Sequence, residues 1–513
     1  MLVPLSIIDS NVQDPTMLLA YVVGIGETWS EREKEEFGER VREAAERVVG
    51  NWRLLQGTAK KLEDGSWAVA VPDEGEPSKP NHFGFVYEAV DKPYHVVSGT
   101  SSPLPPLSSA SSGFFPLPNL SLFRSAGTAV TLPDYERQQA PFLHLKITAL
   151  TDVFAIGLSL PHGIFDGHGM GLVAQALDAE LHHKPWPFSL PPLTSVERGN
   201  PMVNALDAPV EDPNVEAVEV GPPPSNGWRS AVESKLRACV GSAGLLRSYC
   251  KSETWFGFLR REVVEKLVGE VKKEVQTRTE GTEYVSTSDV LSAFLLKSAH
   301  RYEATSATTT LKLITVFNGR TLLDSYQSSS SSSTTYPFSA YPHNCIFPYD
   351  LNSPRPLDLA QLHSMPLADL ALLLRRGLDA HRTLPALKTA WDTRYKPATG
   401  QMAWIGEWSF AWPELPPVLP SLFGLSLPPL RYAISSQLGL KLAALSFPGR
   451  DGKDLPLLAF HVAGDSPFPL MNCFLPQDVE AGVTFTASLH PSRWECLEKA
   501  IEELEGKAED GVC

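Results

Sequence analysis

Three side chains that can transfer a proton or bind a metal lie close together, at His162, Asp166 and His168. An imidazole changes charge near neutral pH, so His162 could act as a general base toward a hydroxyl or an amine. Asp166 could orient that imidazole, as in a catalytic triad, or it could fix the turn by pairing with a buried cation. The spacing alone leaves both roles of Asp166 open.

A metal site is the first alternative for the same residues. His162, Asp166 and His168 form the string His-x-x-x-Asp-x-His, which could bind one ion and make the protein a metal-dependent hydrolase. A zinc site needs a further ligand and supporting hydrogen bonds. His182 and His183 lie near the far end of the following segment, so the spacing alone gives this alternative little support.

The flanking sequence predicts how the histidine is held. In residues 153–160 large apolar side chains alternate with small ones, which is typical of a central strand covered on both faces. Pro161 ends the strand, and Gly163, Gly167 and Gly169 allow a tight turn before a helix that begins near Met170. A histidine at the mouth of a buried strand can meet a molecule that enters from solvent, which favours catalysis over a purely structural loop histidine.

Composition excludes several classes of protein. The 513 residues carry a formal net charge of -15 and show no basic stripe, which argues against nucleic-acid binding. No apolar run is long enough to span a membrane, and the N-terminus lacks the basic region of a signal peptide, so we expect a cytoplasmic protein. The six cysteines have no CxxC spacing and predict reduced thiols. A monomer is expected.

The rest of the chain predicts alternating strands and helices in two halves. Ser30 and Glu33 form a capping-box signature before a helix that Gly50 should end. Residues 101–119 read as a Ser/Pro-rich loop, and the Pro-rich residues 191–230 read as an extended crossover. A second helix should start at Ser286, and the serines at 328–333 predict a surface loop.

Three segments together resemble a known family. Residues 162–167 are similar to the HxxxDG motif of the BAHD acyltransferases, relatives of the chloramphenicol acetyltransferase-like enzymes and of condensation domains. Residues 286–293 resemble the family's ST-x-D-v-l-s-A segment, and residues 318–320 resemble its N-x-R element. Asn344-Cys345 stands in the place of its Gly-Asn-hydrophobic segment, so the resemblance spans most of the chain.

The resemblance implies an α/β fold of two similar lobes, each a mixed β-sheet with helices, with the active site in a tunnel between them. The expected boundaries are residues 1–190 for the N-terminal lobe, 191–230 for the crossover linker and 231–513 for the C-terminal lobe. It also implies that His162 is the general base, and that Asp166 pairs with Arg320 and, with Gly167, supports the site. Asp166 is then a scaffold residue and not a proton relay.

The implied reaction is acyl transfer from acyl-CoA, a co-substrate, to a hydroxyl or less favourably an amine of a small molecule of secondary metabolism. It requires no bound cofactor and no metal. Condensation domains have a second histidine before the catalytic one, where this chain has Pro161, which favours free acyl-CoA over a carrier-bound donor.

The chain departs from the family at one loop. The family's DFGWG loop has no clean copy here, and residues 446–449 are the nearest candidate. Ser435-Ser436-Gln437 stands where many members have Thr-Ser-Trp, so Ser435 or Ser436 is the candidate oxyanion donor. The degenerate loop keeps a second alternative open, in which the same fold performs a cyclisation or an elimination, or only binds.

Overall fold

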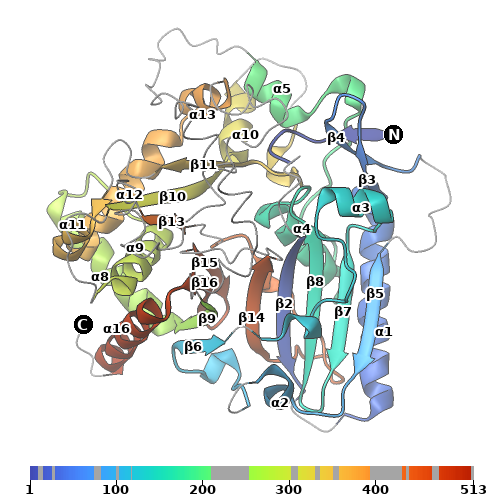
Figure 1. The fold of residues 1–513 in the computed structure, drawn as a ribbon, viewed down its shortest axis with the longest axis horizontal. Coiled ribbons are helices and arrows are strands. Elements are labelled where there is room, and N and C mark those ends of the chain that lie inside the picture. The colour runs from blue at the N-terminus through green and yellow to red at the C-terminus, as the bar shows by residue number, and fades with distance from the viewer. Residues whose placement is uncertain are drawn as a thin grey trace, which may run out of the picture.

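A computed structural model of the chain (Figure 1) describes residues 1–9, 16–25, 29–73, 83–99, 103–116, 118–208, 253–301, 310–329, 336–350, 357–392, 430–434, 438–464 and 473–509. Ser435, Ser436, residues 330–333 of the serine tract 328–333 and residues 209–230 of the predicted crossover lie outside the described residues. Residues 328–329 of the tract belong to helix α10 (Arg320–Ser329) and not to a loop, so that prediction was wrong at this point. Within the predicted crossover, residues 201–207 form helix α5 (Pro201–Asp207) and are not extended. In the part of the chain that is described, no helix is long and apolar enough to cross a membrane.

The first half of the chain forms α-helices, strands and short 3₁₀-helices (η) in the order β1 (Leu2–Pro4), β2 (Thr16–Gly24), α1 (Glu31–Asn51), η1 (Arg53–Gln56), β3 (Thr58–Lys61), β4 (Trp67–Ala70), β5 (Gly84–Ala89), α2 (Tyr94–Ser98), η2 (Leu107–Ser109), β6 (Gly113–Pro116), η3 (Leu120–Leu122), α3 (Leu132–Gln138), β7 (His144–Ala149), β8 (Val153–Pro161), α4 (Gly167–Leu181), η4 (Val196–Arg198) and α5 (Pro201–Asp207).

The second half forms β9 (Glu253–Arg260), α8 (Arg261–Arg278), α9 (Thr287–Ala299), β10 (Thr310–Asn318), α10 (Arg320–Ser329), η5 (Phe338–Ala340), β11 (Ile346–Asp350), β12 (Leu357–Asp358), α11 (Leu359–Ser364), α12 (Leu367–His381), α13 (Leu384–Ala390), β13 (Leu430–Ile434), η7 (Leu442–Ala444), β14 (Leu457–Gly464), β15 (Cys473–Val479), β16 (Gly482–Leu489) and α16 (Pro491–Glu509).

The N-terminal lobe is built on a sheet with the strand order β14-β2-β8-β7-β5. Every residue of β8 is buried, so the predicted central strand is confirmed. The strand ends at Pro161 as predicted, and Pro161 still pairs with Thr16 of β2. The capping box of Ser30 and Glu33 starts α1 as predicted. This helix packs on the sheet through its Phe37 ring, which stacks on Phe154 at 4.1 Å between ring centroids.

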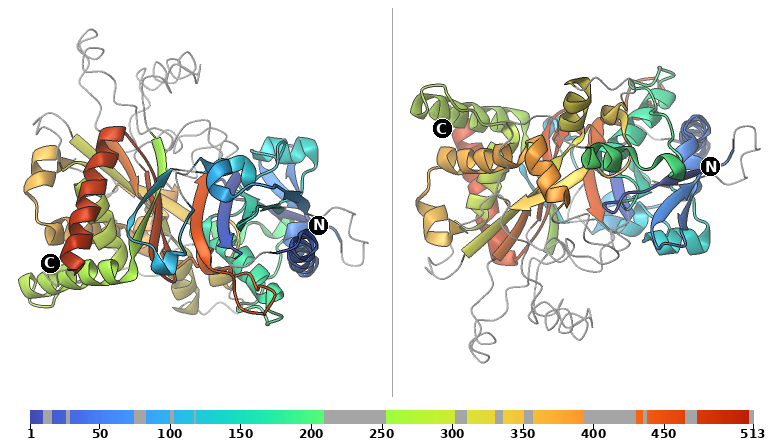
Figure 2. Two further views of the ribbon diagram at one scale, coloured as in Figure 1. Left: turned by 90° about the horizontal axis from the view of Figure 1, so that it is seen from below. Right: turned by 90° about the horizontal axis from the view of Figure 1, so that it is seen from above.

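The C-terminal lobe is built on a larger mixed sheet with the order β11-β10-β13-β15-β16-β9-β6. The helix predicted from Ser286 is present as α9, where the side chains of Ser286 and Asp289 form a capping box. Helices α8 and α16 lie on the side of this sheet that faces away from the N-terminal lobe (Figure 2). In Figure 1 the edge strand β14 of the N-terminal sheet lies nearest to the C-terminal lobe, at the seam between the lobes.

The lobes exchange strands. Strand β6 pairs with β9 in the sheet of the C-terminal lobe, although it lies within residues 101–119, which were predicted as a loop, and that prediction was wrong at this point. Strand β14 crosses in the other direction and pairs antiparallel with β2. The predicted two-lobe fold holds, while the exact residue boundaries of the lobes stay a prediction.

Candidate active site

The loop after β8 is held in a tight turn that brings Asp166 to the start of a helix. The backbone amides of Ile164 and Phe165 both donate to the Pro161 carbonyl at 3.0 Å. Asp166 is the N-cap of α4 and accepts a hydrogen bond from the amide of Gly169 at 3.0 Å. Helix α4 thus begins at Gly167, three residues earlier than the sequence indicated.

Asp166 and Arg320 form a buried bidentate ion pair. Arg320 Nη1 donates to Asp166 Oδ2 at 2.8 Å and Nη2 donates to Oδ1 at 2.9 Å. The Asp166 side chain is 1% exposed and the Arg320 side chain 2%. Burial opposes ionisation of Asp166, but the Arg320 charge and hydrogen bonds outweigh it and hold the Asp166 pKa below its usual value. The carboxylate also accepts from the amide of Cys345 at 3.1 Å.

A short segment, residues 341–345, fastens the other side of the loop. Its carbonyls at Tyr341 and His343 accept from Arg320. The Nδ2 amide of Asn344 donates to the main-chain carbonyl of His162 at 2.8 Å. One ring nitrogen of His343, Nδ1, is 3.2 Å from the Ile164 carbonyl. The segment therefore contacts both the arginine and the histidine loop.

Two other titratable groups next to the loop were not anticipated from the sequence. His343 is buried, and burial lowers its pKa to about 4, so its imidazole is neutral at physiological pH. Asp9 is also buried and accepts a 2.6 Å hydrogen bond from the amide of Asn344. The spacing Ser6-x-x-Asp9, in which the acid caps the serine amide, is the sequence pattern that could have drawn attention to Asp9.

His162 and His168 differ in their surroundings. His162 is half-buried at the end of β8, and Asn344 fixes its main chain. His168 Nε2 is 2.8 Å from the Ser339 carbonyl, and burial lowers the pKa of His168. The Asp166 carboxylate is bound by Arg320 through both of its oxygens. Within the described ranges no group of three or more His, Cys, Asp or Glu side chains could hold a metal ion.

The loop that resembles a degenerate DFGWG motif lies away from His162. The amide and hydroxyl of Ser446 donate to the carboxylate of Asp178, which lies about three helical turns along α4 from Asp166. Phe447 is buried, and its ring packs edge-on against Tyr21 at 5.7 Å between centroids. In this position the loop joins α4 to the sheet of the N-terminal lobe, which is a structural contact.

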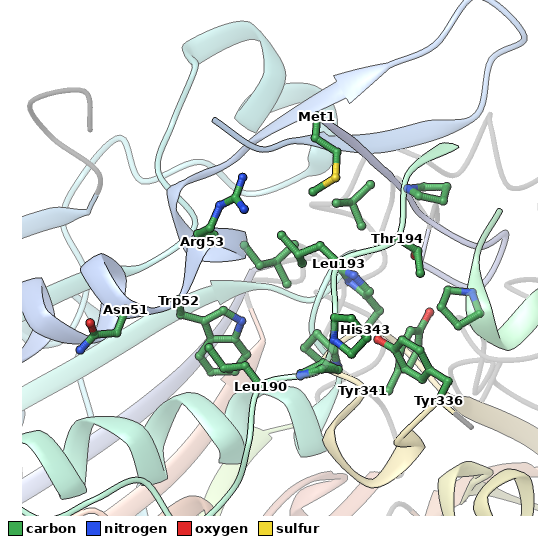
Figure 3. Close-up of a pocket in the computed structure, with 17 residues that line it drawn as sticks. Met1, Asn51, Trp52, Arg53, Leu190, Leu193, Thr194, Tyr336, Tyr341 and His343 are labelled. Atoms are coloured by element: carbon green, nitrogen blue, oxygen red, sulfur yellow. The ribbon is translucent and has the colours of Figure 1, made fainter. Parts of the chain in front are cut away.

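A cavity of about 330 Å³ lies beside the segment that holds the loop (Figure 3). Its walls include the end of α1 with Trp52 and Arg53, the chain around Leu193, and the side chains of Tyr341 and His343. His162 is not among its lining residues. The cavity thus borders the support of the candidate site and not its reactive histidine.

Comparisons with known proteins agree with this architecture. No protein-family profile and no curated protein sequence matches the chain. Among solved structures, F. sporotrichioides TRI101 in complex with coenzyme A and T-2 aligns with a TM-score of 0.59 and 16% identity over 99% of this chain and 98% of that one. F. graminearum TRI101 with coenzyme A and deoxynivalenol aligns with a TM-score of 0.59 and 14% identity over 96% of each chain.

Vinorine synthase aligns with a TM-score of 0.52 and 14% identity, over 98% of this chain and 93% of that one. TRI101 and vinorine synthase are BAHD acyltransferases. At these identities the likeness concerns the fold. The chain therefore has the two-lobed, chloramphenicol acetyltransferase-like fold of the BAHD acyltransferases, as the motifs at 162–167, 286–293 and 318–320 predicted.

Proposed function

We propose that this protein transfers an acyl group from acyl-CoA to a hydroxyl group of a small molecule, with His162 as the general base. The observation that supports this most directly is the state of Asp166. Its carboxylate accepts from Arg320, Gly169 and Cys345, so it supports the loop instead of orienting the imidazole. His162 then remains as the proton-transferring group at the mouth of β8.

The reaction needs one proton carrier and no covalent enzyme intermediate. His162 removes the proton of the acceptor hydroxyl, and the oxygen attacks the thioester carbonyl to form a tetrahedral oxyanion. Collapse of this intermediate breaks the carbon–sulfur bond, and protonated His162 returns the proton to the departing thiolate. The products are the ester and free CoA. Ser435 or Ser436 remains our candidate for the donor that stabilises the oxyanion.

The related structures indicate which co-substrates to test first. Both TRI101 complexes contain coenzyme A together with a small molecule, T-2 or deoxynivalenol. We infer that this chain also takes acyl-CoA and a small-molecule alcohol of secondary metabolism. An amine is a poorer acceptor at neutral pH, because it is mostly protonated and must lose that proton before it can attack.

The first experiment measures free thiol release from a panel of acyl-CoAs in the presence of small-molecule alcohols. We expect acceptor-dependent release of CoA by the natural chain, and a fall of about 10²- to 10⁴-fold in His162→Ala. His168→Ala is the matched control, because His168 lies in the first turn of α4, directly after the loop, and its Nε2 atom is hydrogen-bonded to the Ser339 carbonyl. That variant should keep its rate within a few-fold.

Two results would contradict the proposal. Full activity in His162→Ala would remove the role assigned to that histidine. Absence of both acyl-CoA binding, measured by calorimetry, and thiol release across the panel would favour a cyclisation, an elimination or a binding role on the same fold.

A further inference from the structure

Asp9 is a buried carboxylate with no cation paired to it in the described residues, and it lies just after β1. It is fully buried, and its Oδ2 atom accepts hydrogen bonds from the Ser6 amide at 2.8 Å and the Ser6 hydroxyl at 2.7 Å. Burial raises the pKa of Asp9 to about 7, although its hydrogen bonds with Ser6 and Asn344 lower it. Burying an acid costs free energy, so Asp9 is expected to serve a purpose in the structure.

Asp9 reaches the candidate site through one residue. Its Oδ1 atom accepts from the Asn344 amide at 2.6 Å, and the Asn344 side chain donates to the His162 carbonyl at 2.8 Å. The next amide along, that of Cys345, donates to Asp166 at 3.1 Å. Two carboxylates on different elements therefore hold successive amides of the segment that fixes the histidine.

The main chain of Asp9 also packs closely against the loop that follows His162. A Cβ atom added at Gly163 would lie 3.2 Å from the Asp9 carbonyl and 2.8 Å from the side chain of Leu132. The residue that follows His162 is thus packed against the main chain of Asp9. This packing involves the main chain of Asp9, whereas the side chain of Asp9 is linked to His162 through Asn344.

We propose that Asp9 is a positioning residue for His162, acting through the Asn344 amide and side chain. Asp9 does not touch the reacting atoms; it fixes the Asn344 amide, and Asn344 fixes the main chain that carries the imidazole. The inference rests on the proposed role of His162 as general base. It assigns to the N-terminal end of the chain a part in the reaction that the motifs at 162–167 and 318–320 do not include.

A double-mutant cycle tests whether Asp9 acts through Asn344. Asp9→Asn, Asn344→Ala and the double variant are assayed at a temperature at which each is folded. We expect Asp9→Asn to lower kcat about tenfold while the KM for acyl-CoA stays unchanged, and the double variant to be no slower than Asn344→Ala alone. If the two effects multiply instead, Asp9 does not act through Asn344 and the inference fails.

Val268→Ala in α8 controls for lost stability, since this buried side chain lies in the outer helices of the C-terminal lobe. It should lower the unfolding temperature without lowering kcat. Equal losses of kcat in Val268→Ala and Asp9→Asn, at matched stability, would mean that Asp9 matters only for folding.

Hydrogen exchange gives a reading that does not depend on activity. Peptides covering residues 162–169 and 341–346 should exchange at least tenfold faster in Asp9→Asn than in the natural chain, and unchanged in Val268→Ala. Unchanged exchange in Asp9→Asn would overturn the inference. If the natural chain transfers no acyl group at all, the proposed function fails, and the exchange measurement still decides whether Asp9 holds the loop.

Discussion

Arg320 uses all of its hydrogen-bonding capacity to hold the candidate site together. A guanidinium carries five N–H donors in a fixed plane. Nε donates to the Tyr341 carbonyl, Nη1 to Asp166 and Asn318, and Nη2 to Asp166 and the His343 carbonyl. One side chain thereby joins α4, the end of β10 and the segment 341–345. An ammonium group cannot reproduce these directions.

We therefore expect Arg320→Lys to destabilise the protein although the charge is kept. Carbonyl and carboxylate acceptors would be left without donors in a buried place, which should lower the free energy of unfolding by about 3 kcal/mol or more. Urea denaturation measures this loss. Arg376→Lys is the control, because Arg376 pairs with Glu283 at the surface with 62% of its side chain exposed, and its effect should be below about 1 kcal/mol. Equal losses in the two variants would contradict this account.

Sequence reasoning reached some of these residues and missed others. The pairing of Asp166 with Arg320, 154 positions apart, came from motifs and not from local spacing, because no local pattern encodes a contact at that separation. Asp9 and His343 were missed for the same reason. Their importance depends on burial beside residues that are distant in the chain, and Asp9 alone looks like an ordinary turn residue.

At the scale of the element, the unit of β8, loop and α4 was predicted well because its signals are local. A run of apolar residues, a proline and a helical repeat lie in order within one short stretch. The position of α4 against segment 341–345 is instead set by close approach at one residue. A Cβ atom added at Gly169 would lie 2.0 Å from the carbonyl oxygen of Pro342, which belongs to the backbone and cannot rotate away.

Gly169→Ala should for this reason push segment 341–345 away from α4. We expect a loss of about 1 to 3 kcal/mol in the free energy of unfolding, together with a fall in acyl transfer, measured by denaturation and thiol release. Gly50→Ala offers the comparison, because Gly50 lies in α1 with nothing within 4 Å of an added Cβ atom. That change should stabilise by about 0.5 to 1 kcal/mol. If Gly169→Ala leaves the free energy of unfolding and the acyl-transfer rate unchanged, segment 341–345 can move away from α4 at little cost, which would contradict this prediction.

The end of one helix and the presence of one strand were not predicted correctly from the sequence. Gly50 was expected to end α1, which runs on to Asn51. Strand β6 was read as loop, since four residues among serines and prolines form a strand only because β9 offers them an edge to pair with. Such pairing is decided by the tertiary structure and not by the local sequence.

At the scale of the whole molecule, the seam between the lobes contains a buried histidine. His461 of β14 lies against Phe256 of β9 with ring centroids 4.3 Å apart, and its Nδ1 atom has no hydrogen-bond partner among the described residues. Burial lowers the pKa of His461 to about 3. The folded protein thus keeps this imidazole neutral at pH values at which the unfolded chain protonates it.

This difference predicts how stability depends on pH. Below pH 6.5, the ordinary pKa of histidine, His461 becomes protonated in the unfolded state but stays neutral in the folded state. The free energy of unfolding therefore falls as the pH drops toward 3. Between pH 7 and pH 5 the loss from His461 should be about 2 kcal/mol. Denaturation at both pH values should show that the free energy of unfolding falls less in His461→Leu than in the natural chain, by that amount.

Comparison of the two proteins is required, because the raised pKa of Asp9 works in the opposite direction over the same range. If the free energy of unfolding changes with pH equally in His461→Leu and in the natural chain, the folded protein accommodates the protonated imidazole of His461, which would contradict this prediction.

The exchanged strands also bear on how the protein is made. The sheet of the N-terminal lobe receives its outer strand, β14, from residues 457–464. A ribosome delivers the chain from its N-terminus, so β2 emerges early and keeps an unpaired edge until almost the whole polypeptide has been synthesised. An open edge of this kind is a template for pairing with other chains. Nascent chains of this protein should accordingly depend on chaperones until synthesis has passed residue 464.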